Sequence, residues 1–356
     1  IQDYPARDGL LFRSLDGGNT WVRNDGGLKG FGTSLLARYA DGTLLTGMWT
    51  ETSYGGGMFR SDDRGTTWRE TGLQGHYVID LHIAENGLLY VATAQEVWIS
   101  ADSAKTWQRL NDGLPEQPWL QALTDLPDGT LLASTYFDVY RLDGAKWTKF
   151  SSGLQGNNVS AFLHTHSGEV FAGTTTKGVF RLDLGDSVWV AKNTGIINTS
   201  FTSLIETADG DIYKYLPFFS RRDGDILAGS NLHGIHRTSD KGASWQQTSI
   251  VDEKVRTMAV APDGVIYAGT SGGGGALKSS DNGVTWEKLG LQTAIVNSFF
   301  FQSSDEIFAT TFDGIYHSTD AGKTWELFAF ADTYTSFFVK NHLGQFLVYV
   351  SRRGEQ

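Results

Sequence analysis

Three tryptophans, Trp49, Trp98 and Trp119, stand outside a repeated pattern that accounts for the other eight tryptophans of this 356-residue chain. Trp98 falls inside an expected strand, whereas Trp49 leads into the loop WTETSYGGG and Trp119 ends the proline-bracketed segment PEQPW. Neighbouring loops supply carboxylates and further aromatic rings. Flat aromatic side chains beside carboxylates suit the apolar face and the hydroxyls of a sugar ring, and they equally suit a peptide contact.

These loop side chains form the candidate ligand site. We expect one mouth of the fold to present Trp49, Glu51, Tyr54, Glu96, Trp119, Tyr136 and Asp138. Three further candidates come from loops later in the chain, namely His233, Arg256 and Asp313. The alternative is that the aromatic side chains only cap the ends of strands.

Known catalytic motifs do not assign an activity. The sequence has no H-E-x-x-H, P-loop or G-x-S-x-G pattern, and it contains no cysteine, which excludes disulfides and thiolate metal sites. We therefore predict no metal and no cofactor, and assign no catalytic residue. A glycoside hydrolase stays open as an alternative, because two acids from different repeats could stand ~5–10 Å apart.

Charge and hydropathy limit the classes of partner that we expect for this chain. The net charge is −11, with 40 acidic against 29 basic residues, which argues against tracking of nucleic-acid phosphates. No apolar run approaches the ~18 residues that a membrane-spanning helix needs. The chain starts at Ile1 and not at Met, as a processed form would, so we expect an extracellular or periplasmic protein.

The eight remaining tryptophans recur with gaps of 39 to 56 residues, which marks a repeat architecture. They are Trp21, Trp68, Trp107, Trp147, Trp189, Trp245, Trp286 and Trp325. Six of them end the pattern S/T-x-D-x-G/A-x-S/T-W, here called the box. The copies RLDGAKW and RLDLGDSVW, before Trp147 and Trp189, are one residue short and one residue long.

Each repeat contains four strand patterns. In the copy that ends at Trp286, they are VRTMAVAPDG, VIYAGTS, GALKSS and TWEKL. Four antiparallel strands in about 40 residues are typical of a propeller blade. We predict an all-β, eight-bladed β-propeller over residues 1–356 as a single domain, with seven blades as the alternative. The terminal patterns GLLFRS and TWVRN would join YTSFFVK and GQFLVYV in one blade and close the ring.

The box is interpreted as a turn. Its Asp can accept backbone N–H groups, its Gly supplies a positive φ, and its Trp covers the turn. Such boxes resemble the Asp-box or BNR repeat of sialidases, xyloglucan-degrading propellers, the sortilin propeller and Ycf48-type photosystem assembly factors. The resemblance implies a propeller fold with either glycan processing or protein assembly as its function.

A sialidase is not expected, because the Arg-Ile-Pro tripeptide of that family is missing from the N-terminal third. A convergent arginine triad is not expected either. Arg13, Arg60, Arg141, Arg181 and Arg237 share one repeat position, so we expect them on blade surfaces. Calcium loops are not expected, because the boxes lack alternating carboxylates and a distal Glu.

One long gap, between Trp189 and Trp245, holds an insertion at about residues 210–223. Its segment YKYLPFFSRR suggests a protein contact through Leu216, Phe218 and Phe219, or packing on its own blade. The sequence thus predicts a propeller that binds a ligand, with carbohydrate binding or glycan processing as the first hypothesis. A non-catalytic assembly scaffold of the Ycf48 type and a paired-carboxylate glycoside hydrolase are the alternatives.

Overall fold

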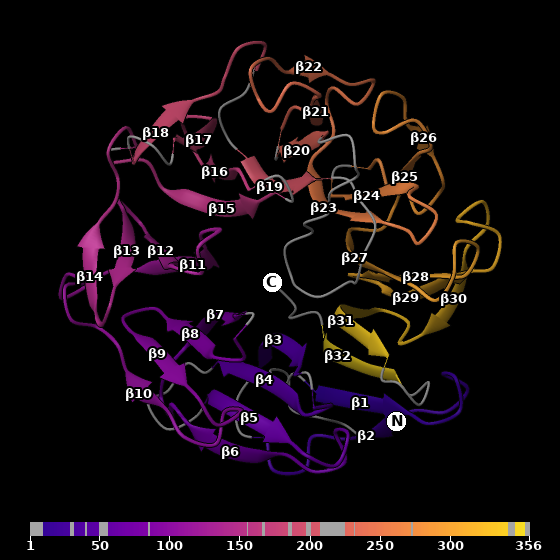
Figure 1. Cartoon of the computed structure of the whole chain (residues 1–356). Coiled ribbons are helices and arrows are strands. Elements are labelled where there is room, and N and C mark those ends of the chain that lie inside the picture. The colour runs from indigo at the N-terminus through magenta and orange to yellow at the C-terminus, as the bar shows by residue number, and fades with distance from the viewer. Residues whose placement is uncertain are drawn as a thin grey trace. The chain divides into compact units, whose positions relative to one another are not determined.

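The computed structural model describes residues 10–28, 32–39, 41–49, 56–84, 86–154, 156–165, 168–183, 187–196, 201–206, 225–230, 232–271, 273–340 and 346–352. These ranges contain eight four-stranded antiparallel sheets and no helix, so the fold is an eight-bladed β-propeller, as predicted. No helix within them is long and apolar enough to cross a membrane. Figure 1 gives the strand labels. The predicted insertion at 210–223, with Leu216, Phe218 and Phe219, lies outside the described residues.

The chain divides into two compact units. Unit 1 comprises Ile1–Leu110, Ala309–His317 and Glu326–Gln356, and unit 2 comprises Asn111–Phe308 and Ser318–Trp325. The sheet of β27 (Val296–Phe301), β28 (Ile307–Thr311), β29 (Gly314–Ser318) and β30 (Glu326–Ala329) has strands in both units.

Unit 1 contains the blade that the two ends of the chain share. Its order is β2-β1-β32-β31, so the N-terminal strands supply the outer half and the C-terminal strands the inner half, as predicted. Its strands are β1 (Leu10–Ser14), β2 (Val22–Arg23), β31 (Thr333–Lys340) and β32 (Phe346–Arg352). Two further sheets follow it: β3 (Gly32–Arg38), β4 (Leu44–Trp49), β5 (Gly57–Ser61) and β6 (Arg69–Gly72), then β7 (Val78–Ile83), β8 (Leu89–Thr93), β9 (Val97–Ser100) and β10 (Gln108–Arg109).

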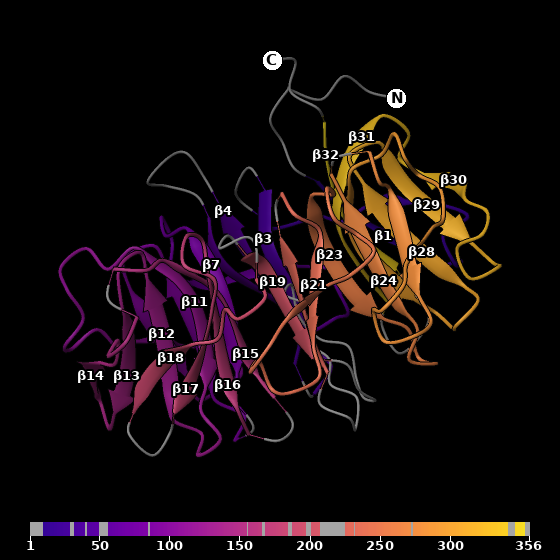
Figure 2. The same ribbon diagram turned by 90° about the horizontal axis from the view of Figure 1, so that it is seen from above.

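Unit 2 contains four complete sheets that follow one another in chain order, as Figures 1 and 2 show. The first two are β11 (Leu120–Asp125), β12 (Leu131–Thr135), β13 (Val139–Asp143) and β14 (Lys146–Lys149), then β15 (Val159–His164), β16 (Val170–Thr174), β17 (Val179–Asp183) and β18 (Val188–Ala191). The next two are β19 (Phe201–Glu206), β20 (Ile226–Ser230), β21 (Ile235–Thr238) and β22 (Gln246–Gln247), then β23 (Val255–Val260), β24 (Ile266–Thr270), β25 (Ala276–Ser279) and β26 (Glu287–Lys288).

The box forms one hydrogen-bonded turn in all six complete copies. In the copy before Trp245, Thr238 Oγ1 donates to Asp240 Oδ1 at 2.6 Å and accepts the N–H of Gly242 at 3.0 Å. Ser244 donates its N–H to Asp240 Oδ1 at 2.9 Å and its hydroxyl to Asp240 Oδ2 at 2.6 Å. Two consecutive left-handed residues, Lys241 (φ 56°) and Gly242 (φ 77°), close the turn. The carboxylate thus replaces the ladder bonds that the hairpin end lacks.

The two degenerate boxes form blades with shorter hairpins, which removes the seven-blade alternative. Asp143 pairs with Lys146 across a two-residue turn, in which Gly144 has φ 66°. The carboxylate of Asp143 now takes side-chain bonds from Thr148 and from Arg141 at 2.8 Å.

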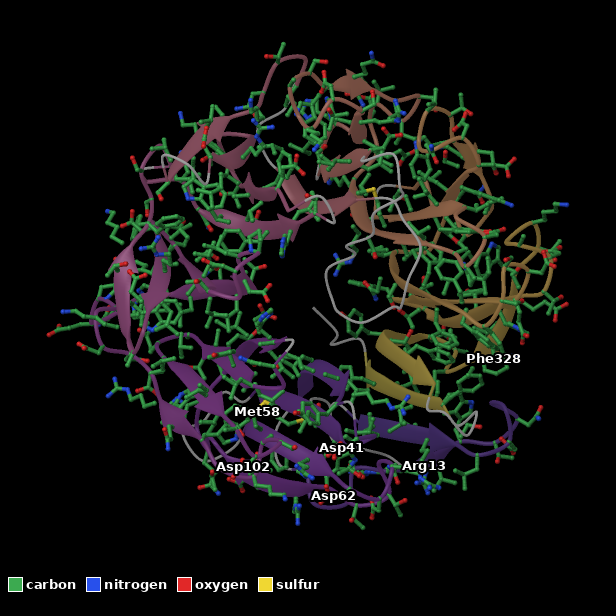
Figure 3. The ribbon with its side chains drawn as sticks, viewed as in Figure 1. Arg13, Asp41, Met58, Asp62, Asp102 and Phe328 are labelled. Carbon is green, nitrogen blue, oxygen red and sulfur yellow. The ribbon has the colours of Figure 1, made fainter. Side chains whose placement is uncertain are left out.

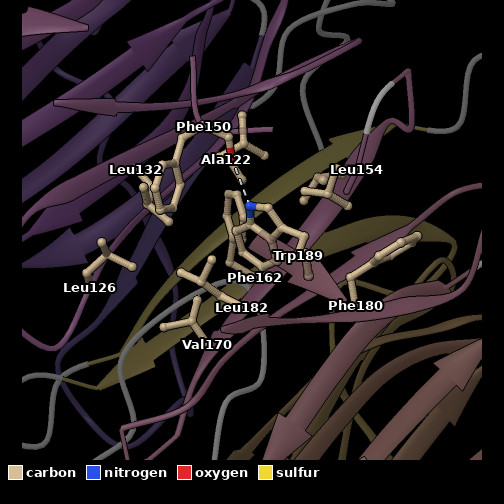
Figure 4. Close-up of a cluster of buried hydrophobic side chains, with 13 residues drawn as sticks. Ala122, Leu126, Leu132, Phe150, Leu154, Phe162, Val170, Phe180, Leu182 and Trp189 are labelled. Atoms are coloured by element: carbon tan, nitrogen blue, oxygen red, sulfur yellow. Dashed lines mark hydrogen bonds between the residues drawn. The ribbon is translucent and has the colours of Figure 1, made fainter. Parts of the chain in front are cut away.

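At four repeats, those of Trp68, Trp147, Trp189 and Trp245, the backbone N–H of the tryptophan ties its blade to the preceding one. The backbone N–H of Trp189 donates to the carbonyl of Ser152 at 2.7 Å, and its indole N–H donates to Phe150 O at 2.9 Å. The indole fills a buried cluster with Phe162 and Leu132, which lie on two neighbouring sheets (Figure 4). Truncation of such a ring costs about 3–5 kcal/mol.

We call each of these backbone bonds between a tryptophan and the preceding blade a junction. The residue that follows the accepting carbonyl has no space for a Cβ beside the tryptophan carbonyl. The residue after the acceptor is a glycine with positive φ at four junctions, namely Gly27, Gly113, Gly153 and Gly195. A Cβ on Gly153 would lie 1.9 Å from Trp189 O. Glycine is therefore required here both by its backbone angle and by the close approach of the next blade.

We predict that Gly153→Ala destabilises the protein far more than Gly129→Ala. Both glycines have positive φ, but a Cβ on Gly129 would meet nothing within 4 Å. Gly129→Ala should cost about 1–2 kcal/mol for the left-handed backbone, and Gly153→Ala at least ~2 kcal/mol more for overlap with a carbonyl that cannot rotate away. Urea unfolding measures both, and equal losses would show that the junction is not this tight.

The box carboxylates predict a loss of stability in acid. Hydrogen bonds from the hydroxyl and N–H of Ser244 and from Thr238 lower the pKa of Asp240 to about 2, from 3.8. Because this pKa is lower in the folded state, the stabilisation is present above pH 4 and disappears as the pH falls towards 2. Asp240→Asn should reduce the pH dependence of the urea midpoint in this window. Asp252→Asn, an exposed acid outside the boxes, serves as the control, and equal slopes for both variants would contradict the prediction.

Candidate functional site

Three exposed aromatic side chains gather at one end of blade β11–β14. Leu120 pairs with Thr135 at the end of the β11–β12 ladder, so Trp119 and Tyr136 flank this pair directly. Trp119 is 51% exposed, Tyr136 50% and Phe137 59%. The rings of Tyr136 and Phe137 lie edge to face with centroids 4.9 Å apart. We call Trp119, Tyr136 and Phe137 the aromatic rim.

The turn that carries Tyr136 and Phe137 is held by Thr135, which is buried. Thr135 Oγ1 accepts the N–H of Phe137 at 3.3 Å and that of Asp138 at 3.0 Å. The same hydroxyl donates to Asp138 O at 3.0 Å, and the Thr135 N–H donates to this carbonyl at 2.8 Å. Two of the three exposed rings therefore project from a fixed backbone.

Trp119 is held in an uncommon conformation. Its φ is 48°, which a bulky residue rarely adopts, and Gln121 Nε2 donates to its carbonyl at 3.2 Å. Gln121 itself is the extra residue of a β-bulge, since Leu120 pairs with Thr135 and Ala122 with Ser134. A strained residue beside a bulge is a feature that clusters at functional sites.

Two of the three acids predicted for this site, Glu96 and Asp138, are engaged in ion pairs within their own blades. Asp138 lies 2.8 Å from Nζ of Lys149 on β14, and this hydrogen bond raises the pKa of Lys149. Glu96 lies 2.8 Å from Nε of Arg109 on β10 and 3.3 Å from Nδ1 of His76. The acids occupy matching places, because Thr93 and Thr135 donate N–H groups to the carbonyls of Glu96 and Asp138. Their pairs anchor the turns between second and third strands.

The other predicted site residues are distributed over both units. Glu51 and Tyr54 lie outside the described residues, and of Trp49 only the backbone, at the end of β4, is described. Asp313 follows β28, where its N–H donates to Thr311 Oγ1 at 2.9 Å and its carbonyl accepts the N–H of Asp332.

His233 and Arg256 belong to adjacent sheets of unit 2. His233 lies in the turn between β20 and β21, and the N–H of Gly234 donates to Glu253 O at 3.0 Å. This bond joins the turn of His233 to the segment that leads into β23, which carries Arg256. Arg256 donates its Nε–H to Asn297 Oδ1 on β27 at 2.8 Å.

Two of the third-strand arginines contribute to the scaffold. Arg60 is 5% exposed and not on the surface as expected. It binds Asp62 at 2.5 Å and donates to Ser103 O in the next box. Arg13 likewise donates to Thr66 in the following box. Figure 3 shows Asp62 and Asp102 on the outer-strand side of their sheets. Among the described residues, no group of three or more His, Cys, Asp or Glu side chains is arranged to hold a metal ion.

We predict that Thr135→Val loosens the aromatic rim while Thr135→Ser does not. Valine keeps the shape but leaves the N–H groups of Phe137 and Asp138 without their acceptor, which costs about 1–3 kcal/mol. Hydrogen exchange at the Asp138 amide should then be roughly tenfold faster. Unchanged exchange in Thr135→Val would mean that this hydroxyl does not hold the turn.

Comparisons with known proteins agree with this fold. The model of the DUF6242 beta propeller domain matches residues 226–342. A xyloglucanase from Hypocrea jecorina (strain QM6a) is 28% identical over 208 residues, 44% of this chain and 24% of the relative, so the match spans about a quarter of that protein. The Dos1 propeller aligns with TM-score 0.64 and 12% identity over 92% of this chain and 93% of its own. YCF48 bound to D1 peptide aligns with TM-score 0.51 and 14% identity over 91% and 94%. The chain is thus similar to xyloglucanase in sequence and to a Ycf48-type propeller in fold, as the boxes predicted.

Proposed function

We propose that this propeller binds carbohydrate through the aromatic rim. The observation that carries the proposal is the grouping of Trp119, Tyr136 and Phe137, each half exposed or more, at one end of a single blade. Exposure of aromatic rings to water is unfavourable, and grouped exposed rings are a common feature of ligand-binding surfaces.

The surroundings of the rim favour a sugar as the ligand. Rings with fixed backbones bind with little loss of conformational entropy. Gln121, exposed on the same strand, supplies an amide, and the Asp138–Lys149 pair supplies charged hydrogen-bonding groups at the base of the turn. Stacking on rings combined with such polar groups matches the apolar faces and hydroxyls of a saccharide. The similarity to a xyloglucanase supports the same ligand class.

The role that we propose is binding without hydrolysis. A glycosidase needs two carboxylates on either side of the bond that is cleaved. Glu96 and Asp138, two of the predicted site acids, are instead held by Arg109 and Lys149 as loop anchors. The proposal includes an extracellular or periplasmic location, where polysaccharides are accessible.

Titration with oligosaccharides from xyloglucan, β-glucan and pectin, followed by calorimetry, tests the proposal. At least one class should bind, and Trp119→Ala and Tyr136→Ala should each lower the affinity about tenfold, because a central aromatic contact contributes more than 1 kcal/mol. Val284→Ala removes a similarly exposed apolar side chain from a box turn and should leave binding unchanged.

Absence of binding to every oligosaccharide would overturn the proposal. Binding of an extended peptide that is lost in Trp119→Ala would assign the rim to protein interaction instead. Release of new reducing ends during the titration would favour the glycoside hydrolase alternative.

A further inference from the structure

One end of blade β7–β10 in unit 1 repeats the arrangement of the aromatic rim. Tyr77, which is 49% exposed, directly precedes Val78, and Val78 pairs with Thr93 at the end of the β7–β8 ladder. Trp119 has the same place in blade β11–β14, directly before the pair that ends the β11–β12 ladder. Each of these two blades therefore presents an exposed aromatic ring at the point where its first strand begins.

The same two blades have an acid at a place where other blades have glycine. The N–H of Thr93 donates to the carbonyl of Glu96 at 2.8 Å, and Asp138 accepts the same bond in blade β11–β14. In the three other complete sheets of unit 2, the residue that accepts this bond is a glycine, namely Gly178, Gly234 and Gly275. The backbone bond is thus made without a carboxylate, so the acidic side chain is available for further contacts.

Besides its ion pair with Arg109, Glu96 faces the imidazole of His76. Glu96 Oε2 lies 3.3 Å from Nδ1 of His76, whose side chain is 34% exposed. The imidazole packs edge to face on Trp98, with centroids 5.6 Å apart, and the N–H of His76 donates to Leu73 O at 3.1 Å. A carboxylate beside Nδ1 favours the neutral tautomer that carries its proton there, which leaves Nε2 as a hydrogen-bond acceptor.

We infer that His76, Tyr77 and Glu96 form a second carbohydrate site, in which Tyr77 stacks on a sugar ring and His76 Nε2 accepts a hydrogen bond from a hydroxyl. The ligand class rests on the proposed function of the aromatic rim, whereas the second site lies in unit 1 and binds a ligand by itself. Glu96 orients the imidazole, and its charge is balanced by Arg109. An aromatic face beside a neutral acceptor suits an uncharged saccharide.

Equilibrium dialysis with cellotetraose and with a xyloglucan heptasaccharide counts the sites on each chain. Wild-type protein should bind two molecules of at least one of these saccharides, and Trp119→Ala should still bind one.

Variants made in the Trp119→Ala background then test the second site. Tyr77→Ala and His76→Phe should each lower the remaining affinity at least tenfold, because they remove the stacking ring and the acceptor atom. Tyr77→Phe keeps the ring and should keep the affinity. His76→Gln should restore most of the affinity that His76→Phe loses, because its amide oxygen can accept the same hydrogen bond.

Leu15→Ala is the control, since it removes an exposed apolar side chain from a box turn of the same unit. It should leave both sites unchanged, and urea unfolding verifies that every variant is folded. One site per chain that disappears in Trp119→Ala, or a remaining site that Tyr77→Ala does not weaken, would overturn this inference and leave the aromatic rim in place. One site that persists in Trp119→Ala and is lost in Tyr77→Ala would support the second site and not the rim. If neither saccharide binds, both proposals fall.

Discussion

The backbone bond from a box tryptophan to the preceding blade is the constraint on which much of the structure depends. The N–H of Trp189 meets the carbonyl of Ser152 at 2.7 Å, and the next residue must be a glycine, because any Cβ would overlap Trp189 O. The indole then buries its ring between two sheets and donates to the end of the preceding outer strand. One tryptophan therefore links two sheets through its backbone and its side chain. This explains why the tryptophan is the clearest signal of the repeat in the sequence.

The polar groups at the box end of each blade also serve the structure of the propeller. Each box uses its carboxylate, its hydroxyls and two left-handed residues to close one hairpin, and the arginines Arg13 and Arg60 bind into the next box. These groups are polar and titratable, yet they serve the scaffold. The ends where first strands begin and second strands finish do not have this structural role, and there the structure leaves Trp119 and Tyr136 half exposed.

The sequence predicts the eight blades, the strand order and the shared terminal blade, because these depend on local signals of turn residues and a period near 40. The bulges could not be predicted from the sequence, because Leu120-Gln121-Ala122 has the alternating pattern of an ordinary strand. In the structure Gln121 has no partner position on β12. The need for glycine at positions such as Gly153 could not be predicted either. It arises from the carbonyl of a tryptophan about 40 residues away in the sequence, which leaves no space for a Cβ. Trp119 and Tyr136 are placed at one end of one sheet, and their role in ligand binding stays a prediction.

The bulges give the propeller positions at which a side chain can vary without altering the blades. A bulge residue makes no regular ladder pair, so its side chain can change with little effect on the sheet. In unit 2 this position holds Gln121, Ser160 and Arg256, three residues of different size and charge on similar strands. Asn297 shows how such a residue is positioned, because its Oδ1 on the neighbouring strand β27 accepts the Arg256 Nε–H at 2.8 Å. Side chains of adjacent blades can therefore position one another at this level, as Arg256 and Asn297 do.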